Sequence, residues 1–80
     1  MSVEMDVLYD GSLKCRAIHV PSGRVIGTEA PVDNGGTGSE FSPTDLMGAA
    51  LASCVMTVMG IVAQRQGLEL RGMQARVVKE

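Results

Sequence analysis

Residues 42–67 read SPTDLMGAALASCVMTVMGIVAQRQG, and this stretch predicts one long helix around which the rest of the chain is organised. Ser42 is a favourable N-cap because its hydroxyl can accept a hydrogen bond from a free amide of the first turn, and Pro43 suits the first helical position. Asp45 places negative charge near the positive end of the helix. Gly67 permits the left-handed turn that ends helices. The sequence therefore predicts both ends of the helix.

The apolar residues of this helix do not keep to one stripe but go all the way round it. They are Leu46, Met47, Ala49, Ala50, Leu51, Ala52, Cys54, Val55, Met56, Val58, Met59, Ile61, Val62 and Ala63. A helix that is apolar on all sides is expected to be buried on all sides. It would be roughly 36 Å long at 1.5 Å per residue. A domain of this size buries only about 60% of its unfolded surface, so one chain cannot cover such a helix alone. We expect either an intertwined oligomer or the front part of a longer protein.

Short strands are predicted on both sides of the helix. Apolar and polar residues alternate over residues 3–9 and again over residues 13–20, with Asp10-Gly11 as the hairpin turn between them. Residues 24–30 form a third, less regular strand after a turn at residues 21–23. Residues 68–79 alternate again and predict a further strand. The pattern is a three-stranded antiparallel meander, a long buried helix and one more strand, which is a single α+β domain over residues 1–80.

Charge and composition exclude several classes of function. The net charge is −2 and the basic residues are scattered, so no nucleic-acid footprint is present. The helix has the length of a membrane span, but Ser53 and Thr57 lie inside it and no aromatic belt flanks it, so we expect no membrane. The N-terminus lacks the basic and apolar regions of a signal peptide, so the expected location is the cytoplasm. The glycine-rich loop at residues 31–39 lacks the spacing of a phosphate-binding motif.

Cys54 is the residue whose type and setting suggest a reaction. It lies in the body of the helix, beyond the reach of the helix-end charge, so a cation would be needed to make it a thiolate. From the residues alone, a packing role for Cys54 is favoured over a reactive one. Cys15 is interpreted as a packed strand residue and His19 as a residue on the surface at a strand end. Their spacing provides no zinc site.

The run SPTDLMGAALASC at residues 42–54, followed by an apolar helix and by QRQGLELRGMQARVVKE at residues 64–80, resembles the OsmC/Ohr family. These are the osmotically inducible and organic hydroperoxide resistance proteins. The similarity covers residues 36–80, and the cysteine eleven positions after the proline is part of a specific signature. With this resemblance, the interpretation of Cys54 changes from packing to redox chemistry.

The resemblance implies an intertwined homodimer in which two long central helices are buried side by side. It also implies that Cys54 is the peroxidatic thiol, which a hydroperoxide oxidises to a sulfenic acid. A second cysteine would resolve this acid to a disulfide, and an external dithiol or small thiol would reduce it, with no bound cofactor or metal. The expected partners are therefore a second copy of the chain, a hydroperoxide and a thiol reductant.

The chain departs from the family pattern in several places. The pattern extends over roughly 140 residues, the size of one domain, so the resemblance implies that this chain is the N-terminal half and that the resolving cysteine belongs to the remainder. In peroxide-reducing members a glutamate in the first turn of the helix orients an arginine against the thiolate. That position is Thr44 here, with Asp45 beside it, and Arg16 is a candidate for the cation. Thr44, Asp45 and Arg16 are thus the candidates for shaping the surroundings of Cys54.

Two alternatives to the enzyme remain open at this point. The first is a non-catalytic OsmC-like module for dimerisation or small-ligand binding, in which Cys54 only packs. The second is an inert truncated homologue that keeps the fold signature. The hypothesis that we carry forward is an OsmC-like thiol peroxidase acting in defence against oxidative stress.

Overall fold

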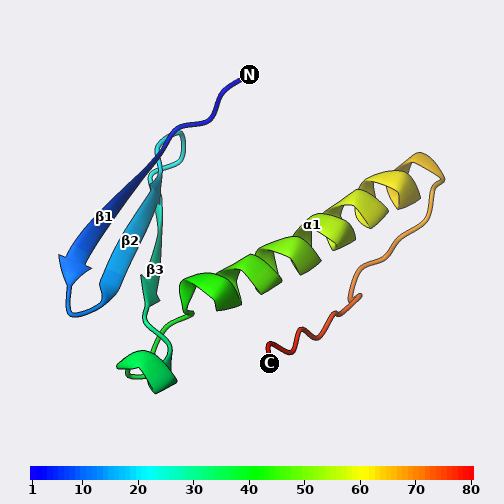
Figure 1. The fold of residues 1–80 in the computed structure, drawn as a ribbon. Helices are drawn as coiled ribbons and strands as arrows, with labels where there is room; N and C mark the ends of the chain where they lie inside the picture. Colours follow the sequence, from blue (N-terminus) through cyan, green and yellow to red (C-terminus); the bar gives the residue numbers. More distant parts are fainter. The chain divides into compact units, whose positions relative to one another are not determined.

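Three strands and one long helix make up the secondary structure of the chain in the computed structural model, which describes residues 1–80 (Figure 1). The strands are β1 (Met5–Gly11), β2 (Lys14–His19) and β3 (Arg24–Glu29), followed by a short 3-10 helix η1 (Val32–Asn34) and by α1 (Pro43–Arg65). The chain divides into two units, Met1–Thr44 and Asp45–Glu80, which are described separately below. These elements confirm the predicted α+β class.

The strands form an antiparallel meander in the order β1-β2-β3, as predicted. Tyr9 pairs with Cys15 across the first ladder, and Cys15 pairs with Thr28 across the second. Since side chains alternate along a strand, this register sorts them onto two faces. One face is mostly apolar and carries Met5, Val7, Tyr9, Cys15, Ala17 and Ile26. The opposite face carries the charged residues that matter below.

The first hairpin differs from its prediction. Strand β1 continues through Gly11, and the turn is made by Ser12 and Leu13, both with positive φ (55° and 64°). The pairing register shifts between Tyr9 and Gly11, which is the mark of a β-bulge. The predicted turn at Asp10-Gly11 is therefore wrong by two residues, because the bulge keeps Asp10 in the strand. The Leu13 amide donates to the Tyr9 hydroxyl at 3.2 Å, which ties the turn to the strand.

Helix α1 has the ends that the sequence predicts. It begins at Pro43, directly after Ser42, which is buried. Beyond its C-terminus, Gly67 has a φ of 72° and its amide donates to the Gln64 carbonyl at 3.1 Å. The Leu68 amide donates to the Ala63 carbonyl at 2.8 Å. These two bonds form a Schellman motif, which glycine stabilises because it adopts the left-handed conformation without a Cβ penalty.

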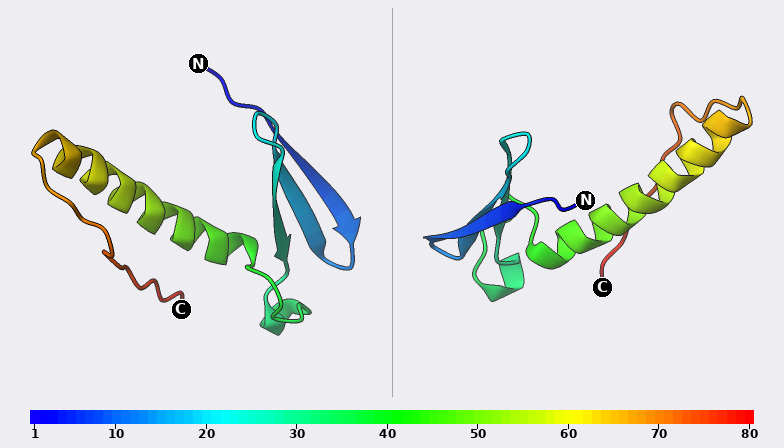
Figure 2. Two further views of the ribbon diagram at one scale, coloured as in Figure 1. Left: turned by 180° about the vertical axis from the view of Figure 1, so that it is seen from behind. Right: turned by 90° about the horizontal axis from the view of Figure 1, so that it is seen from above.

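After this turn, residues 68–80 run back beside α1 within the second unit (Figures 1 and 2). Lys79 Nζ lies 2.7 Å from Asp45 Oδ1, and Val77 packs over Gly48. The strand predicted for residues 68–79 is not formed. A strand requires a neighbouring strand to pair its amides and carbonyls, and the chain places no such strand beside this segment.

Burial along α1 is concentrated on the side that this segment runs along. Most of the partly or fully buried positions recur every three or four residues, and together they are Asp45, Leu46, Gly48, Ala49, Ala52, Met56, Gly60 and Ala63. Elsewhere large apolar side chains are exposed, with Met47 at 71% and Leu51 at 68%. The predicted all-round burial is thus not reached within one chain, and the expectation that one chain cannot cover this helix is confirmed.

By length and composition α1 could also cross a membrane. The core helices of soluble proteins can have the same length and apolar composition, so these two properties are weak support for a membrane span.

Candidate functional site

Cys54 lies on the uncovered side of α1 and is exposed. At 3.6 residues per turn it is rotated about 200° from both Ala52 and Met56, which belong to the covered side. Its neighbours on the same face of the helix are Ala50, Leu51, Thr57 and Val58, one turn away on either side. All four are exposed. The thiol therefore sits in the middle of an open, mostly apolar surface, which we call the Cys54 face.

The helix itself offers Cys54 no cation. The nearest charged residues of α1 are Asp45, nine positions earlier, and Arg65, eleven positions later. At 1.5 Å per residue these lie about 14 Å and about 16 Å away along the axis, beyond side-chain contact. The positive helix end is equally distant, and its influence fades within the first turn. Any group that stabilises the Cys54 thiolate must come from outside α1.

The two candidates in the first turn of α1 have other partners. The Thr44 hydroxyl lies 3.2 Å from the Ser42 hydroxyl, and the Asp45 carboxylate forms the ion pair with Lys79. Both residues are therefore held by their local surroundings. Neither approaches Cys54 of the same helix, because of the axial separation given above.

Arg16, the candidate cation, is held by a carboxylate that the sequence interpretation assigned only to a turn. Arg16 Nε donates to Asp10 Oδ2 at 2.7 Å, and Nη2 donates to Oδ1 at 3.0 Å. This bidentate arrangement lowers the pKa of Asp10, mainly through the hydrogen bond from Arg16, and raises the pKa of Arg16. The missed signal is the position of Asp10 two residues after Leu8, the register partner of Arg16. Alternation along β1 puts Asp10 on the same face of the sheet as Leu8 and Arg16 only if β1 continues beyond Asp10, and the sequence predicted that the strand ends before it.

A second carboxylate on the charged face of the sheet fixes the glycine-rich loop. Glu29 is 2% exposed, and its Oε1 accepts hydrogen bonds from the amides of Thr37 (3.1 Å) and Ser39 (2.9 Å). The Thr37 hydroxyl donates to the same carboxylate at 3.0 Å, and Lys14 Nζ lies 3.9 Å away. The loop that leads into α1 is thus wound around a buried carboxylate at the end of β3.

The Glu29 carboxylate should make the folded state sensitive to acid. Burial raises the pKa of Glu29, but the hydrogen bonds from Thr37, Ser39 and the Gly38 amide, with the charge of Lys14, outweigh it, so the net pKa is lowered from the ordinary 4.5. A depressed carboxyl pKa stabilises the folded state above the unfolded value, and this contribution is lost as the pH falls through the folded value. We expect the melting temperature to decrease as the pH is lowered below 4.5, and the Thr37 and Ser39 amide resonances to shift over the same pH range.

The Glu29→Gln variant is the control for this titration. It should remove the acid-dependent shift of both amide resonances while leaving the titration of Asp10 in place. Amide resonances that titrate equally in the variant would show that another group is responsible.

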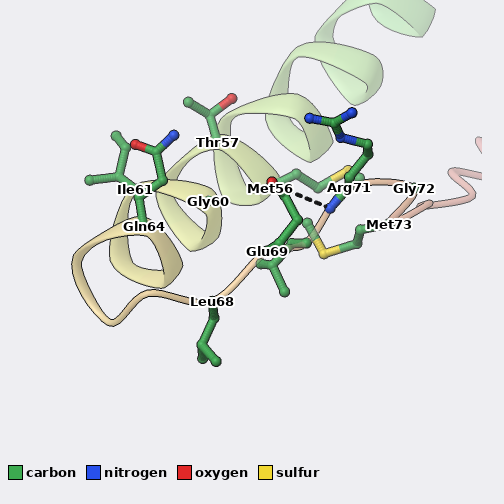
Figure 3. Close-up of a pocket in the computed structure, with 11 residues that line it drawn as sticks. Met56, Thr57, Gly60, Ile61, Gln64, Leu68, Glu69, Arg71, Gly72 and Met73 are labelled. Atoms are coloured by element: carbon green, nitrogen blue, oxygen red, sulfur yellow. Dashed lines mark hydrogen bonds between the residues drawn. The ribbon is translucent and has the colours of Figure 1, made fainter.

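A cavity of about 410 Å³ lies in the second unit beside the C-terminal half of α1, and Thr57 of the Cys54 face is among its lining residues (Figure 3). Its lining comes from the C-terminal half of α1 and from the segment that turns back beyond it. These residues are Met56, Thr57, Gly60, Ile61, Gln64, Leu68, Glu69, Leu70, Arg71, Gly72 and Met73. The Arg71 amide donates to Glu69 Oε1 at 2.9 Å and stiffens this turn. The cavity lining mixes apolar and polar side chains.

The remaining residues considered from the sequence stand apart from this chemistry. Both cysteines are free, and Cys15 is half-buried on the apolar face of the sheet. His19 is exposed at the end of β2, as predicted, and its Nδ1 bonds the Ser22 hydroxyl across the turn. The structure brings no three His, Cys, Asp or Glu side chains together in a metal-binding arrangement.

Comparison with known proteins gives two matches. A family model described as OsmC-like protein matches residues 36–80. A crystal structure from Psychrobacter arcticus 273-4, described as an osmotic stress induced and detoxification response protein, is 46% identical with a TM-score of 0.90. That match covers 95% of this chain but only 56% of the other, so the chain spans just over half of its structural neighbour. No curated protein matches the chain.

Proposed function

Because the chain belongs to the OsmC-like protein family, we propose that it is a thiol-dependent reductase of organic hydroperoxides with Cys54 as the reacting residue. The observation that carries the proposal is the place of Cys54, an exposed thiol in the middle of an open apolar face on the helix that the family match includes. The structural neighbour is described as a stress and detoxification response protein, and peroxide removal is one form of detoxification. The proposed role is accordingly defence against oxidative stress.

In the proposed reaction the Cys54 thiolate attacks the terminal oxygen of a hydroperoxide ROOH. An S–O bond forms, the O–O bond breaks, and the leaving alkoxide takes up a proton and departs as the alcohol ROH. The sulfur is oxidised by two electrons to a sulfenic acid, and the peroxide is reduced by the same two electrons. An external dithiol then reduces the sulfenic acid back to the thiol, releasing water and becoming a disulfide. The electrons therefore come from the dithiol, without a bound cofactor.

The apolar character of the Cys54 face favours an organic peroxide over hydrogen peroxide. Leu51 and Val58 flank the thiol one turn away on either side, and both are exposed. An alkyl chain held between these side chains and the second copy that covers α1 in the proposed dimer would lose its contact with water, which is favourable by about 0.8 kcal/mol for each buried CH₂ group. Hydrogen peroxide has no alkyl chain and gains nothing from this surface.

The reaction requires a second copy of the chain. Helix α1 leaves most of its apolar surface uncovered, and no cation of the same helix reaches Cys54. We assign the role of cation to Arg16 and the shaping of the site to Thr44 and Asp45. Since the first turn of α1 is about 14 Å from Cys54 along the axis, Thr44 and Asp45 can only approach the thiol of another copy. The proposed active form is an intertwined homodimer in the cytoplasm, in which residues 68–79 would find a strand to pair with.

Trapping of the sulfenic acid tests this proposal directly. The reduced protein is mixed with a stoichiometric amount of cumene hydroperoxide in the presence of dimedone, which reacts with sulfenic acids. We expect one dimedone adduct on Cys54, none on Cys15, and release of cumyl alcohol. Hydrogen peroxide in a parallel sample should give slower labelling. If the cumene hydroperoxide persists and Cys54 stays unlabelled, the chain is not a thiol peroxidase.

A second candidate function is the binding of a small ligand without catalysis. The observation that favours it is the cavity lined by Met56, Gly60, Ile61 and Met73, which is large enough for a small organic molecule. Fluorescent fatty acids that bind equally well to the wild type and to the Cys54→Ser variant, without any consumption of peroxide, would select this alternative.

A further inference from the structure

Gly60 marks a space in the second unit that no side chain of the chain fills. It lies inside α1, where glycine is less favourable than alanine. At Gly48, in the first half of the helix, the missing side chain makes room for Val77, which would lie 3.1 Å from a Cβ atom. At Gly60 no atom outside the adjacent helix backbone comes within 4 Å of that position. Gly60 therefore opens the side of α1 to the cavity that it lines.

The side chains that surround this space are long and mostly apolar. Met56 and Ile61 lie on α1, and Leu68 and Met73 lie on the segment that turns back beyond it. Met56 and Met73 are both half-buried. Methionine is flexible and polarisable, so it packs against apolar groups of different shapes. The space over Gly60 is therefore suited to an alkyl chain of a few carbons.

Arg71 supplies an unpaired positive charge to the same cavity. Its guanidinium takes part in none of the ion pairs of the chain. The carboxylate of Glu69, which also lines the cavity, accepts a hydrogen bond from the Arg71 amide at 2.9 Å instead (Figure 3). A guanidinium can bind a carboxylate through two parallel hydrogen bonds. Because Glu69 repels negative charge, a ligand group with one negative charge is favoured over a phosphate with two.

We propose that this cavity binds a small organic acid, with the carboxylate on the Arg71 guanidinium and the alkyl chain over Gly60. The inference rests on the second candidate function, ligand binding in this cavity, for which it names the ligand class and the residue that recognises it. It is independent of peroxide reduction at Cys54, because the ligand need not be a peroxide. A second copy of the chain is the competing occupant of the space over Gly60.

The test is a titration of the full chain with octanoate, followed through the amide resonances of Gly60 and Gly72 in NMR spectra. We expect both resonances to shift along a saturable curve. The uncharged analogue 1-octanol should bind at least about tenfold more weakly, because it lacks the carboxylate. Octylamine, which carries the opposite charge, should bind no better than 1-octanol. Hexanoate should bind about fifteenfold more weakly than octanoate, since each buried CH₂ group contributes about fourfold in affinity.

Two variants change the cavity in different ways. Arg71→Gln should weaken octanoate binding at least about tenfold and leave the binding of 1-octanol unchanged. Gly60→Leu should abolish the binding of both compounds because its side chain fills the space. Its melting temperature should not fall, since a Cβ atom meets no other atom there and leucine favours a helix more than glycine does. Arg76→Gln is the matched control, because Arg76 lies on the same segment without lining the cavity.

Equal affinities for octanoate and 1-octanol, or an unchanged octanoate affinity in Arg71→Gln, would overturn the assignment of an organic acid. An absence of any shift at Gly60 would rule out ligand binding in the cavity altogether. If Gly60→Leu then also weakened self-association, a second copy of the chain would be the occupant of the space. The Cys54→Ser variant should bind octanoate with wild-type affinity, so a failure of peroxide reduction is distinguishable from a failure of this inference.

Discussion

The Cys54→Ser variant is expected to lose peroxide reduction completely, with a fall in rate of at least about a thousandfold, or about 4 kcal/mol in the activation barrier. The nucleophile is the thiolate, and a serine hydroxyl neither ionises near neutral pH nor accepts an oxygen atom from a peroxide. Consumption of cumene hydroperoxide in the presence of a dithiol measures the loss. Because Cys54 is exposed in the single chain, the substitution should not disturb its packing.

Cys15→Ser provides the matched control for this experiment. Cys15 is the other free thiol of the chain and lies half-buried on the sheet. Its replacement should leave peroxide consumption within about twofold of the wild type, well under the 1.4 kcal/mol that a tenfold change represents. Equal activity in the two variants would mean that the reaction does not depend on Cys54 at all.

The second large effect is expected for Leu51→Lys, which should weaken self-association at least tenfold. Leu51 belongs to the Cys54 face and is 68% exposed in the single chain. In a homodimer that covers α1 this side chain would be buried, and a lysine there would have to give up the hydration of its charge. Each tenfold loss of affinity corresponds to about 1.4 kcal/mol, a small part of that cost. Sedimentation velocity across a concentration series measures the change.

A variant outside α1 separates this effect from a general loss of solubility or folding. Val20→Lys changes an exposed apolar residue (45%) at the hairpin end of the sheet unit. It should leave the association constant unchanged, and both variants should retain the helical circular dichroism of α1. A wild-type chain that remains monomeric at high concentration would contradict the proposed dimer, whatever the variants do.

The helix was predictable from the sequence almost to the residue, because its ends are set by local chemistry. Ser42 and Pro43 favour a helix start wherever they occur together, and Gly67 favours the left-handed residue that closes the Schellman motif. The alternation of apolar residues was also sufficient to predict the three strands and their antiparallel order. The helix-end residues and the apolar alternation each depend on a few neighbouring residues, so they can be recognised in a single sequence.

Features that depend on pairing were not predictable in the same way. The turn expected at Asp10-Gly11 moved to Ser12-Leu13 because the bulge depends on how β1 meets β2. The bond between Asp10 and Arg16 follows from that register, so residue types alone do not reveal it. The alternation of residues 68–79 predicted a further strand that is not formed, because a pattern cannot supply the neighbouring strand that a ladder needs.

The amides of the glycine-rich loop before α1 bind a carboxylate of the same chain, which the composition of the loop does not reveal. In many proteins the backbone amides of a loop that precedes a helix bind the phosphate groups of a nucleotide. In this chain the amides of Thr37, Gly38 and Ser39 donate hydrogen bonds to the Glu29 carboxylate, so these donors are already occupied by a side chain of the protein. Added phosphate or ATP could bind to these amides only by displacing the Glu29 carboxylate. Neither compound should therefore raise the melting temperature.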